Sequence, residues 1–401
     1  MKNFTLLLAG LMMVLASCGG TEAVTDETVA EEERIIPGAE SVDEYLPLVK
    51  DKRVCILSNQ TGMVTPERHV LDTLLSLGVN VVSILSPEHG FRGTADAGEL
   101  VSSSVDEATG VPIKSLYDGK GGVPSQETID GFDVLVFDLQ DVGCRFYTYI
   151  TTMTKVMGVC AANGKKMIIL DRPNPLGFYV DGPILDMKYK SGVGYLPIPV
   201  VHGMTLGEMA GMINGEKWLE DGIQCDVEVI KCRNWTHQSK YVLPVKPSPN
   251  LPDMRSIYLY PSMCYFEATP VSLGRGTDKA FQMYGHPNMK GYSFTFTPRS
   301  VPGAKNPPQL DRECHGVDLR TVPSIDVINE AGINLSYVID AYRNLNLDSH
   351  FFRSFFELLI GRDYVRKMIM EGASADEIKA MWADDVASFK EQRRPYLLYE
   401  E

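Results

Sequence analysis

Apolar runs of strand length recur through the first half of the chain. They occupy residues 54–58, 79–85, 113–116, 134–137 and 167–170. Each run is continuously apolar, which is typical of parallel strands because helices cover both faces of a parallel sheet. The pattern therefore predicts an α/β fold with a mostly parallel sheet and helices on both of its faces.

Helical spacing appears between these runs and again near the end of the chain. Helices are expected at residues 69–77, 125–129 and 146–163. Thr205 with Glu208 and Ser374 with Glu377 have the spacing of capping boxes, which begin helices. After the second box, one apolar helix face is expected to contain Ile378, Met381, Trp382 and Phe389.

Composition changes after residue 225, where prolines become frequent and the expected strands become short. We therefore place a domain boundary there. Residues 41–225 are predicted to form the sheet domain, which carries the catalytic loops. Residues 226–401 are predicted to form a smaller α+β domain that completes a cleft.

The first residues have the pattern of an export signal. Lys2 precedes an apolar run at residues 4–16, which is too short to span a bilayer. The run ends in Leu-Ala-Ser-Cys at residues 15–18, which resembles the lipobox of bacterial lipoproteins. We expect residues 1–17 to be cleaved and Cys18 to be lipidated, the alternative being a secretory signal with an incidental cysteine. Acidic residues 18–40 would then tether an exported protein to a bacterial membrane, at the periplasmic face or the cell surface.

Charge and cysteine content exclude several classes of function. The formal net charge of −14 argues against nucleic-acid binding and against electrostatic binding to anionic lipids. The seven cysteines after Cys18 show no Cys-x-x-Cys spacing, so most are expected to be buried small hydrophobic residues. The sequence leaves undecided whether Cys225 and Cys232 form a disulfide. No zinc-binding pattern appears, so no metal is expected.

Polar residues follow several of the predicted strands. They are Asn59, Glu88, Gln140, Asp141, Asp171, Arg172 and Asn174. In open parallel sheets, ligands bind at this carboxyl edge, although polar residues also end strands for purely structural reasons. No Gly-x-Gly-x-x-Gly follows the first strand, so the sheet is predicted to be Rossmann-like without a dinucleotide, and no cofactor is expected.

Three further segments carry candidate chemistry. His202 precedes a predicted helix and is either a ligand contact or a cap-region histidine. Asn250 offers an amide from a stiff, proline-rich loop. Arg275 stands between two glycines, which would let a ligand approach its guanidinium; the alternative is a tight turn with a Glu267–Arg275 salt bridge.

Taken together, these motifs resemble the NamZ-type exo-β-N-acetylmuramidases. The resemblance runs from about residue 53 to the end of the chain. It rests on residues 59–62 (NQTG), 87–90 (PEHG), 137–149 (FDLQDVGCRFYTY), 171–175 (DRPNP), 202–205 (HGMT), 266–267 (FE) and 274–277 (GRGT). One departure is Ala268, at a position where members of the family often have glycine.

The resemblance implies a Rossmann-like N-terminal domain, a smaller C-terminal domain and an active site between them. It also implies a glycoside hydrolase of cell-wall recycling that releases N-acetylmuramic acid from the non-reducing ends of peptidoglycan fragments. Its partners would be a disaccharide or muropeptide substrate and, through lipidated Cys18, the membrane. The competing hypothesis is a lipoprotein that binds muropeptides or sugars without cleaving them.

Glycoside cleavage requires one carboxyl group to protonate the leaving oxygen and a second group on the other side of the sugar. We predict that Glu88 is the general acid/base; the second group is Glu267, Asp141 or the acetamido oxygen of the substrate. A guanidinium should bind the lactyl carboxylate of muramic acid, and the candidates are Arg275, Arg172 and Arg145. The remaining predicted substrate contacts are Asn59, His89, Arg92, Gln140, Asp171, Asn174, His202 and Asn250.

Overall fold

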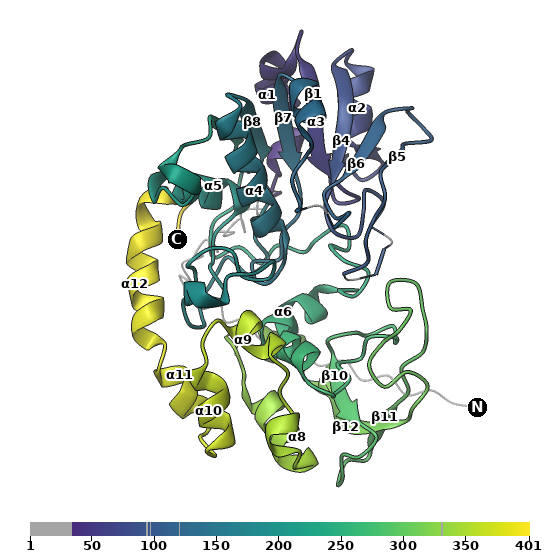
Figure 1. The fold of residues 1–401 in the computed structure, drawn as a ribbon, viewed down its shortest axis with the longest axis vertical. Coiled ribbons are helices and arrows are strands. Elements are labelled where there is room, and N and C mark those ends of the chain that lie inside the picture. The colour runs from purple at the N-terminus through teal and green to yellow at the C-terminus, as the bar shows by residue number, and fades with distance from the viewer. Residues whose placement is uncertain (1–33, 94, 97, 120, 330–331) are drawn as a thin grey trace, which may run out of the picture. The chain divides into compact units, whose positions relative to one another are not determined.

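A seven-stranded sheet with the order β5-β6-β4-β1-β7-β8-β9 forms the first half of the fold (Figure 1). Its strands are β1 (Arg53–Ser58), β4 (Asn80–Ser86), β5 (Ser104–Val105), β6 (Pro112–Ser115), β7 (Val134–Asp138), β8 (Lys166–Leu170) and β9 (Val227–Ile230). All neighbouring strands of this sheet pair in parallel, except that β5 and β6 pair antiparallel. The six parallel strands have the doubly wound Rossmann order. The predicted α/β fold is confirmed.

This computed structural model describes residues 34–401 except 94, 97, 120, 330 and 331. Residues 35–401 form one compact unit. The predicted signal peptide, lipidated Cys18 and most of the acidic tether lie outside the described residues. Within the described part, no helix is both long and apolar enough to cross a membrane.

Strand residues alternate between two hydrophobic cores, one on each face of the sheet. Cys55 and Leu57 of β1 face the larger core, whereas Val54 and Ile56 face the smaller one. Helices α1 (Val42–Val49) and α2 (Val70–Ser76) cover the smaller core; α3 (Gln126–Asp130), α4 (Tyr149–Ala162) and α5 (Leu206–Gly215) contribute to the larger one. The predicted two-sided burial follows from this alternation. A short hairpin joins β2 (Met63–Thr65) to β3 (Arg68–His69).

The second half of the chain combines helices with a small antiparallel sheet, below the main sheet in Figure 1. The small sheet has the order β10-β12-β11 and is built from β10 (Met283–His286), β11 (Phe294–Phe296) and β12 (Cys314–Asp318). The helices are α6 (Met254–Met263), α7 (Ser324–Asn329), α8 (Ser336–Leu345), α9 (Phe355–Ile360), α10 (Tyr364–Met370), α11 (Ala375–Ala380) and α12 (Ala383–Arg393). Strand β9 belongs to the main sheet, so that sheet extends past the boundary predicted near residue 225.

Two expectations about helices need correction. The helix predicted after Ser374 is two helices, because Trp382 interrupts the helical geometry with φ −110° and ψ 11°. Met381 is consequently exposed at 58%, whereas the other three predicted stripe residues are buried. Both capping boxes are present as predicted.

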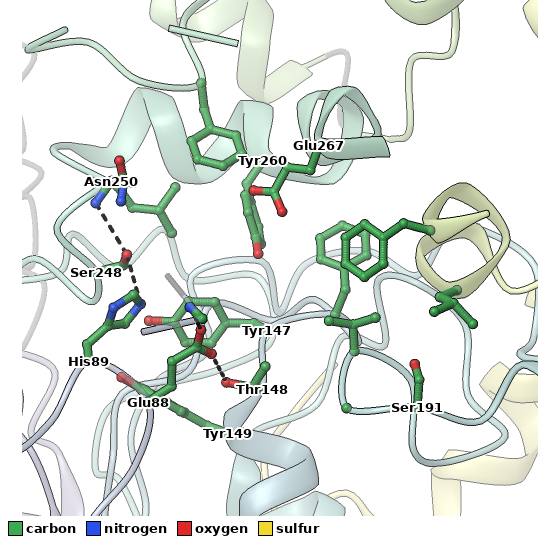
Figure 2. Close-up of a pocket in the computed structure, with 18 of the residues that line it drawn as sticks. Glu88, His89, Tyr147, Thr148, Tyr149, Ser191, Ser248, Asn250, Tyr260 and Glu267 are labelled. Carbon is green, nitrogen blue, oxygen red and sulfur yellow. Dashed lines mark hydrogen bonds between the residues drawn. The ribbon is translucent and has the colours of Figure 1, made fainter. Parts of the chain in front are cut away.

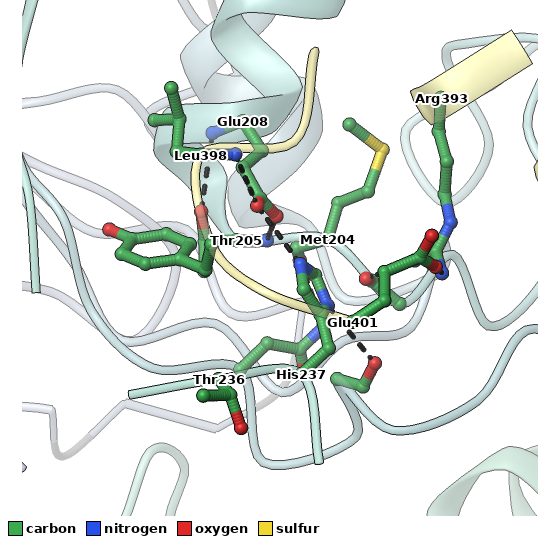
Figure 3. Close-up of polar contacts among 12 residues, drawn as sticks. Met204, Thr205, Glu208, Thr236, His237, Arg393, Leu398 and Glu401 are labelled. Atoms are coloured by element: carbon green, nitrogen blue, oxygen red, sulfur yellow. Dashed lines mark hydrogen bonds and ion pairs between the residues drawn. The ribbon is translucent and has the colours of Figure 1, made fainter. Parts of the chain in front are cut away.

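The C-terminal residues return to the sheet domain (Figure 3). The Leu398 N–H donates to the Glu208 carboxylate at 2.9 Å, and His237 Nε2 lies 3.0 Å from the same oxygen. The Tyr399 hydroxyl donates to Asp171 at 2.6 Å, and Arg393 pairs with Glu401 at 2.6 Å. The end of the chain therefore closes the polar loops around the start of α5.

All seven cysteines of the described chain are buried and free, so the structure contains no Cys225–Cys232 disulfide. The prediction that most of them behave as small hydrophobic residues is confirmed.

Candidate active site

A pocket of about 470 Å³ lies between loops of the main sheet and the second half of the chain. Figure 2 shows Glu88 and Glu267 on opposite sides of it. Five of the predicted site residues line this pocket, namely Glu88, His89, Asn250, Glu267 and Arg275. They come from the loop after β4, the loop before α6, and the segment that follows α6.

Glu88 is held at the pocket by two hydrogen-bond donors. Its Oε1 accepts from the Gly98 N–H at 2.8 Å, and its Oε2 accepts from the Thr148 hydroxyl at 2.7 Å. Burial together with the nearby Glu88 carboxylate raises the pKa of Tyr117 to about 12. The two donors come from separate segments, so the carboxylate has a fixed direction.

His89 adopts a left-handed backbone conformation with φ 68°, which is uncommon for a residue other than glycine. Its Nδ1 lies 2.8 Å from the Ala95 carbonyl oxygen, and its Nε2 lies 3.4 Å from the Ser248 hydroxyl. Gly90 follows with φ 76°. The buried imidazole thus stabilises a strained turn that directs Glu88 into the pocket.

Glu267 and Arg275 form an ion pair in the pocket wall, with Nη2 2.5 Å from Oε1. Both side chains are partly exposed, at 25% for Glu267 and 16% for Arg275. The flanking glycines have φ 86° and 82°, and a Cβ at Gly276 would come within 2.5 Å of the Arg299 carbonyl oxygen. The salt bridge that was the alternative to a ligand-binding Arg275 is therefore present, and both of its residues line the pocket.

An aromatic wall completes the pocket on the side of α4. Tyr147 and Tyr149 pack edge to face at 4.7 Å, and Tyr147 donates to the Pro247 carbonyl at 2.8 Å. Asn59 does not line the pocket; its amide donates to the Tyr149 hydroxyl at 2.6 Å from behind the wall. Sequence reasoning missed these tyrosines and Thr148 as site residues, although they follow β7 at the same edge of the sheet as Glu88.

The arginines Arg172 and Arg145 are buried away from the pocket, contrary to their predicted role. Arg172 forms a bidentate salt bridge with Asp138, at 2.6 and 3.0 Å. Arg145 donates to the carbonyls of Pro183, Ile198 and Leu359, and burial lowers its pKa to about 10. Their guanidinium groups bind other parts of the protein, which leaves Arg275 as the guanidinium in the pocket wall.

Asp171 and His202 also lie outside the pocket lining. Asp171 accepts hydrogen bonds from Thr205, Gly207 and Tyr399, and burial raises its pKa to about 6. Burial and two nearby arginines lower the pKa of His202 to about 3, and its Nδ1 accepts from the Met204 N–H. His202 therefore has the cap-region placement that was the alternative to a ligand contact.

The amides Asn174 and Gln140 bind backbone groups. Asn174 donates to the Met204 carbonyl at 2.8 Å, and Gln140 donates to the carbonyls of Asp141 and Pro173. Neither lines the pocket. Both amides hold loops together at the strand ends.

Asp141 and Arg92 complete the predicted set. Asp141 lies outside the pocket lining; it accepts from the Gly143 N–H at 2.7 Å, and burial raises its pKa to about 7. Arg92 is largely exposed and pairs with Asp106. Among the described residues, no group of three or more His, Cys, Asp or Glu side chains could hold a metal ion.

Comparison with known proteins identifies the family. Residues 54–255 match the N-terminal domain of the exo-beta-N-acetylmuramidase NamZ, and residues 258–399 match the C-terminal domain. The chain belongs to the NamZ family. It is 36% identical over 420 residues to the peptidoglycan beta-N-acetylmuramidase NamZ of Bacillus subtilis (strain 168), covering 99% of this chain and 100% of that protein.

Two solved structures from Bacteroides fragilis NCTC 9343, both described as DUF1343 family proteins, share the fold. The first is 59% identical with a TM-score of 0.86, and the second is 28% identical with a TM-score of 0.76. Each comparison covers 92% of this chain and 99% of the other. The NamZ family architecture therefore extends over nearly the whole chain.

Proposed function

We propose that this NamZ-family protein is an exo-acting glycoside hydrolase that releases N-acetylmuramic acid from the non-reducing ends of peptidoglycan fragments. The main support is the arrangement of two carboxylates. Glu88 comes from the loop after β4 and Glu267 from the second half of the chain, and both line one pocket. Paired carboxyl groups on two sides of a sugar are the usual apparatus of glycoside hydrolysis.

Glu88 serves as the general acid/base in this proposal. In its protonated form it donates to the glycosidic oxygen as the bond to the sugar breaks, and afterwards the carboxylate takes a proton from the attacking water. Its two donors, Gly98 and Thr148, hold the group in one place for both steps. Glu267 is the leading candidate for the second group because Asp141 does not line the pocket, and the acetamido oxygen of the substrate is the alternative.

Arg275 is proposed to bind the lactyl carboxylate that distinguishes muramic acid from glucosamine. One guanidinium N–H group pairs with Glu267, and a guanidinium has five N–H donors in a planar fork. The same arginine can therefore contact Glu267 and a substrate carboxylate together. This would place the anionic substituent of the sugar beside the second carboxylate.

Glu88→Gln tests the central assignment with the disaccharide of N-acetylmuramic acid and N-acetylglucosamine as substrate. We expect kcat to fall by a factor of about 10² to 10⁴ because the proton transfer is lost, while the thermal unfolding temperature stays within about 2 °C. Glu99→Gln is the matched control, since Glu99 lies in the same loop and pairs with Lys305 outside the pocket lining. Near-normal turnover by Glu88→Gln would refute the role.

The same assay separates hydrolysis from binding alone. Free N-acetylmuramic acid that accumulates beyond one equivalent per protein indicates an enzyme. Retention of one equivalent of intact disaccharide indicates a sugar-binding lipoprotein instead.

The exported, lipid-anchored location is a separate proposal that rests on the sequence at residues 15–18. Metabolic labelling with a fatty-acid analogue should modify the wild-type protein and leave Cys18→Ser unlabelled. Equal labelling of both proteins would refute lipidation at Cys18.

A further inference from the structure

A second pocket adjoins the first along the initial turns of α4. Its volume is about 370 Å³. The two pockets share the lining residues Gly98, Tyr117, Thr148, Gly192 and Val193. Together they provide adjacent spaces along one side of the sheet edge.

Glu88 is positioned where the two pockets meet. Glu88 lines the first pocket, and its two hydrogen-bond donors, Gly98 and Thr148, line both pockets, as does the nearby Tyr117. A general acid/base must lie beside the glycosidic oxygen that it protonates. The bond that Glu88 serves therefore lies at this junction, with one sugar on each side.

The charged groups distinguish the two sides. Glu267 and Arg275 line the first pocket, and neither lines the second. The second catalytic group must face the sugar whose anomeric carbon reacts. The first pocket is thus the place of the reacting muramic acid, whose carboxylate has Arg275 as its partner, and the second pocket is on the leaving-group side.

Small and neutral residues dominate the second pocket. It is lined by glycines, by three threonines, by leucines and by Lys155, without a carboxylate among the described lining residues. The Lys155 ammonium donates to the Gly121 carbonyl at 3.0 Å and lies 5.8 Å from the centre of the Tyr195 ring. Hydroxyl and ammonium donors beside apolar surface suit an uncharged sugar ring.

We infer that this second pocket is the leaving-group subsite and accepts the neutral N-acetylhexosamine released by cleavage. Thr152 and Lys155 of α4 form its specific wall, since they line this pocket and not the first. The inference rests on the proposed function and adds a location for the leaving sugar.

The test compares two substrates that share the reacting sugar. One is the N-acetylmuramyl-N-acetylglucosamine disaccharide, and the other is N-acetyl-β-muramyl fluoride, whose leaving group is a single atom. Thr152→Trp should fill the second pocket and lower kcat/KM for the disaccharide at least tenfold, with less than a twofold change for the fluoride. Lys155→Ala should shift the ratio in the same direction with a smaller effect, about threefold, and it removes no core residue.

A matched control uses the pocket on the other side of the ion pair. A third pocket of about 370 Å³ shares Glu267 and Arg275 with the first and is lined by exposed Asn306. Asn306→Trp should affect both substrates equally. Thermal unfolding of each variant confirms that the protein compared is folded.

Three outcomes would overturn the subsite. Equal losses on both substrates in Thr152→Trp would show that this wall serves the reacting sugar. Unchanged kinetics in both α4 variants would show that the pocket binds no substrate. A selective loss in Asn306→Trp would place the leaving sugar on the other side. Absence of turnover of both substrates by the wild-type protein would instead refute the proposed function itself.

Discussion

Two groups of acidic residues follow the strands of the main sheet, and their surroundings differ sharply. Asp138 ends β7 and Asp171 follows β8, and both are buried against partners from the same chain. Glu88 follows β4 and is only half buried; it faces Glu267 across a pocket. A carboxylate at a strand end is therefore a candidate for catalysis only where the rest of the chain leaves it accessible.

The difference arises from what covers each strand end. The last residues of the chain and the start of α5 supply donors to Asp171, and Arg172 neutralises Asp138. After β4, Gly98 and Thr148 donate to Glu88, and its carboxylate still lines the pocket. Buried acids become structural when their partners are complete, because unpaired buried charge is costly.

The largest difference in kcat between an accessible and a buried carboxylate is expected for the variants Glu267→Gln and Asp141→Asn. Glu267→Gln should reduce kcat about a thousandfold, equal to about 4 kcal/mol in the barrier, because the pocket loses its second carboxylate. Asp141→Asn should change kcat less than threefold, since Asp141 does not line the pocket. Steady-state kinetics on the disaccharide measures both. The reverse ranking would make Asp141 the second group.

Arg172→Met should destabilise the protein by about 3 kcal/mol because it leaves the Asp138 carboxylate buried without its partner. Urea unfolding measures the loss, and kcat per folded molecule should stay unchanged. The double variant Arg172→Met/Asp138→Leu is the control, and it should recover part of the stability. A large loss of kcat with normal stability would instead return Arg172 to the active site.

Asp141 should make the stability of the protein fall as the pH rises. Burial raises its pKa to about 7 in the folded protein, against about 3.9 in an unfolded chain, so the folded state binds the proton more tightly. Its contribution is full below about pH 4 and is lost as the pH rises towards 7. Between pH 5 and pH 7 the loss is about 2 kcal/mol. Urea unfolding at several pH values should show this slope in the wild type and a flatter profile in Asp141→Asn; parallel profiles would contradict it.

The smallest effect is expected from Tyr399→Phe, which removes one of the donors to Asp171. The predicted loss is about 1 kcal/mol of stability, with kcat unchanged. Tyr396→Phe is a milder control because its hydroxyl bonds to Glu216 near the surface. Equal losses of stability in the two variants would show that the hydrogen bond to Asp171 stabilises the protein no more than the surface bond to Glu216.

Much of the fold was predictable because local patterns determine it. The apolar runs of β1, β4, β7 and β8 are buried on both faces, as their continuous apolar sequence predicts. The capping boxes at Thr205 and Ser374 are also local, since each spans only four residues. The break at Trp382 escaped prediction because the apolar stripe continues through it while the backbone does not.

The site was predictable only in part. Glu88, His89, Asn250, Glu267 and Arg275 were expected to act together, and the structure brings them to one pocket. Sequence reasoning also assigned Arg145, Arg172 and His202 to the substrate, since a charged residue beside a strand end has the same sequence pattern whether it is covered or open.

The sequence by itself determined the parallel sheet, the starts of the capped helices and the set of polar residues at one edge of the sheet. Only the tertiary structure decided which of those residues face a cavity. The physical reason is that periodicity and capping act over a few residues, whereas coverage depends on distant segments. Tyr399 satisfies Asp171 from 228 positions away, while Glu267 arrives from the second half of the chain to face Glu88 across an open space.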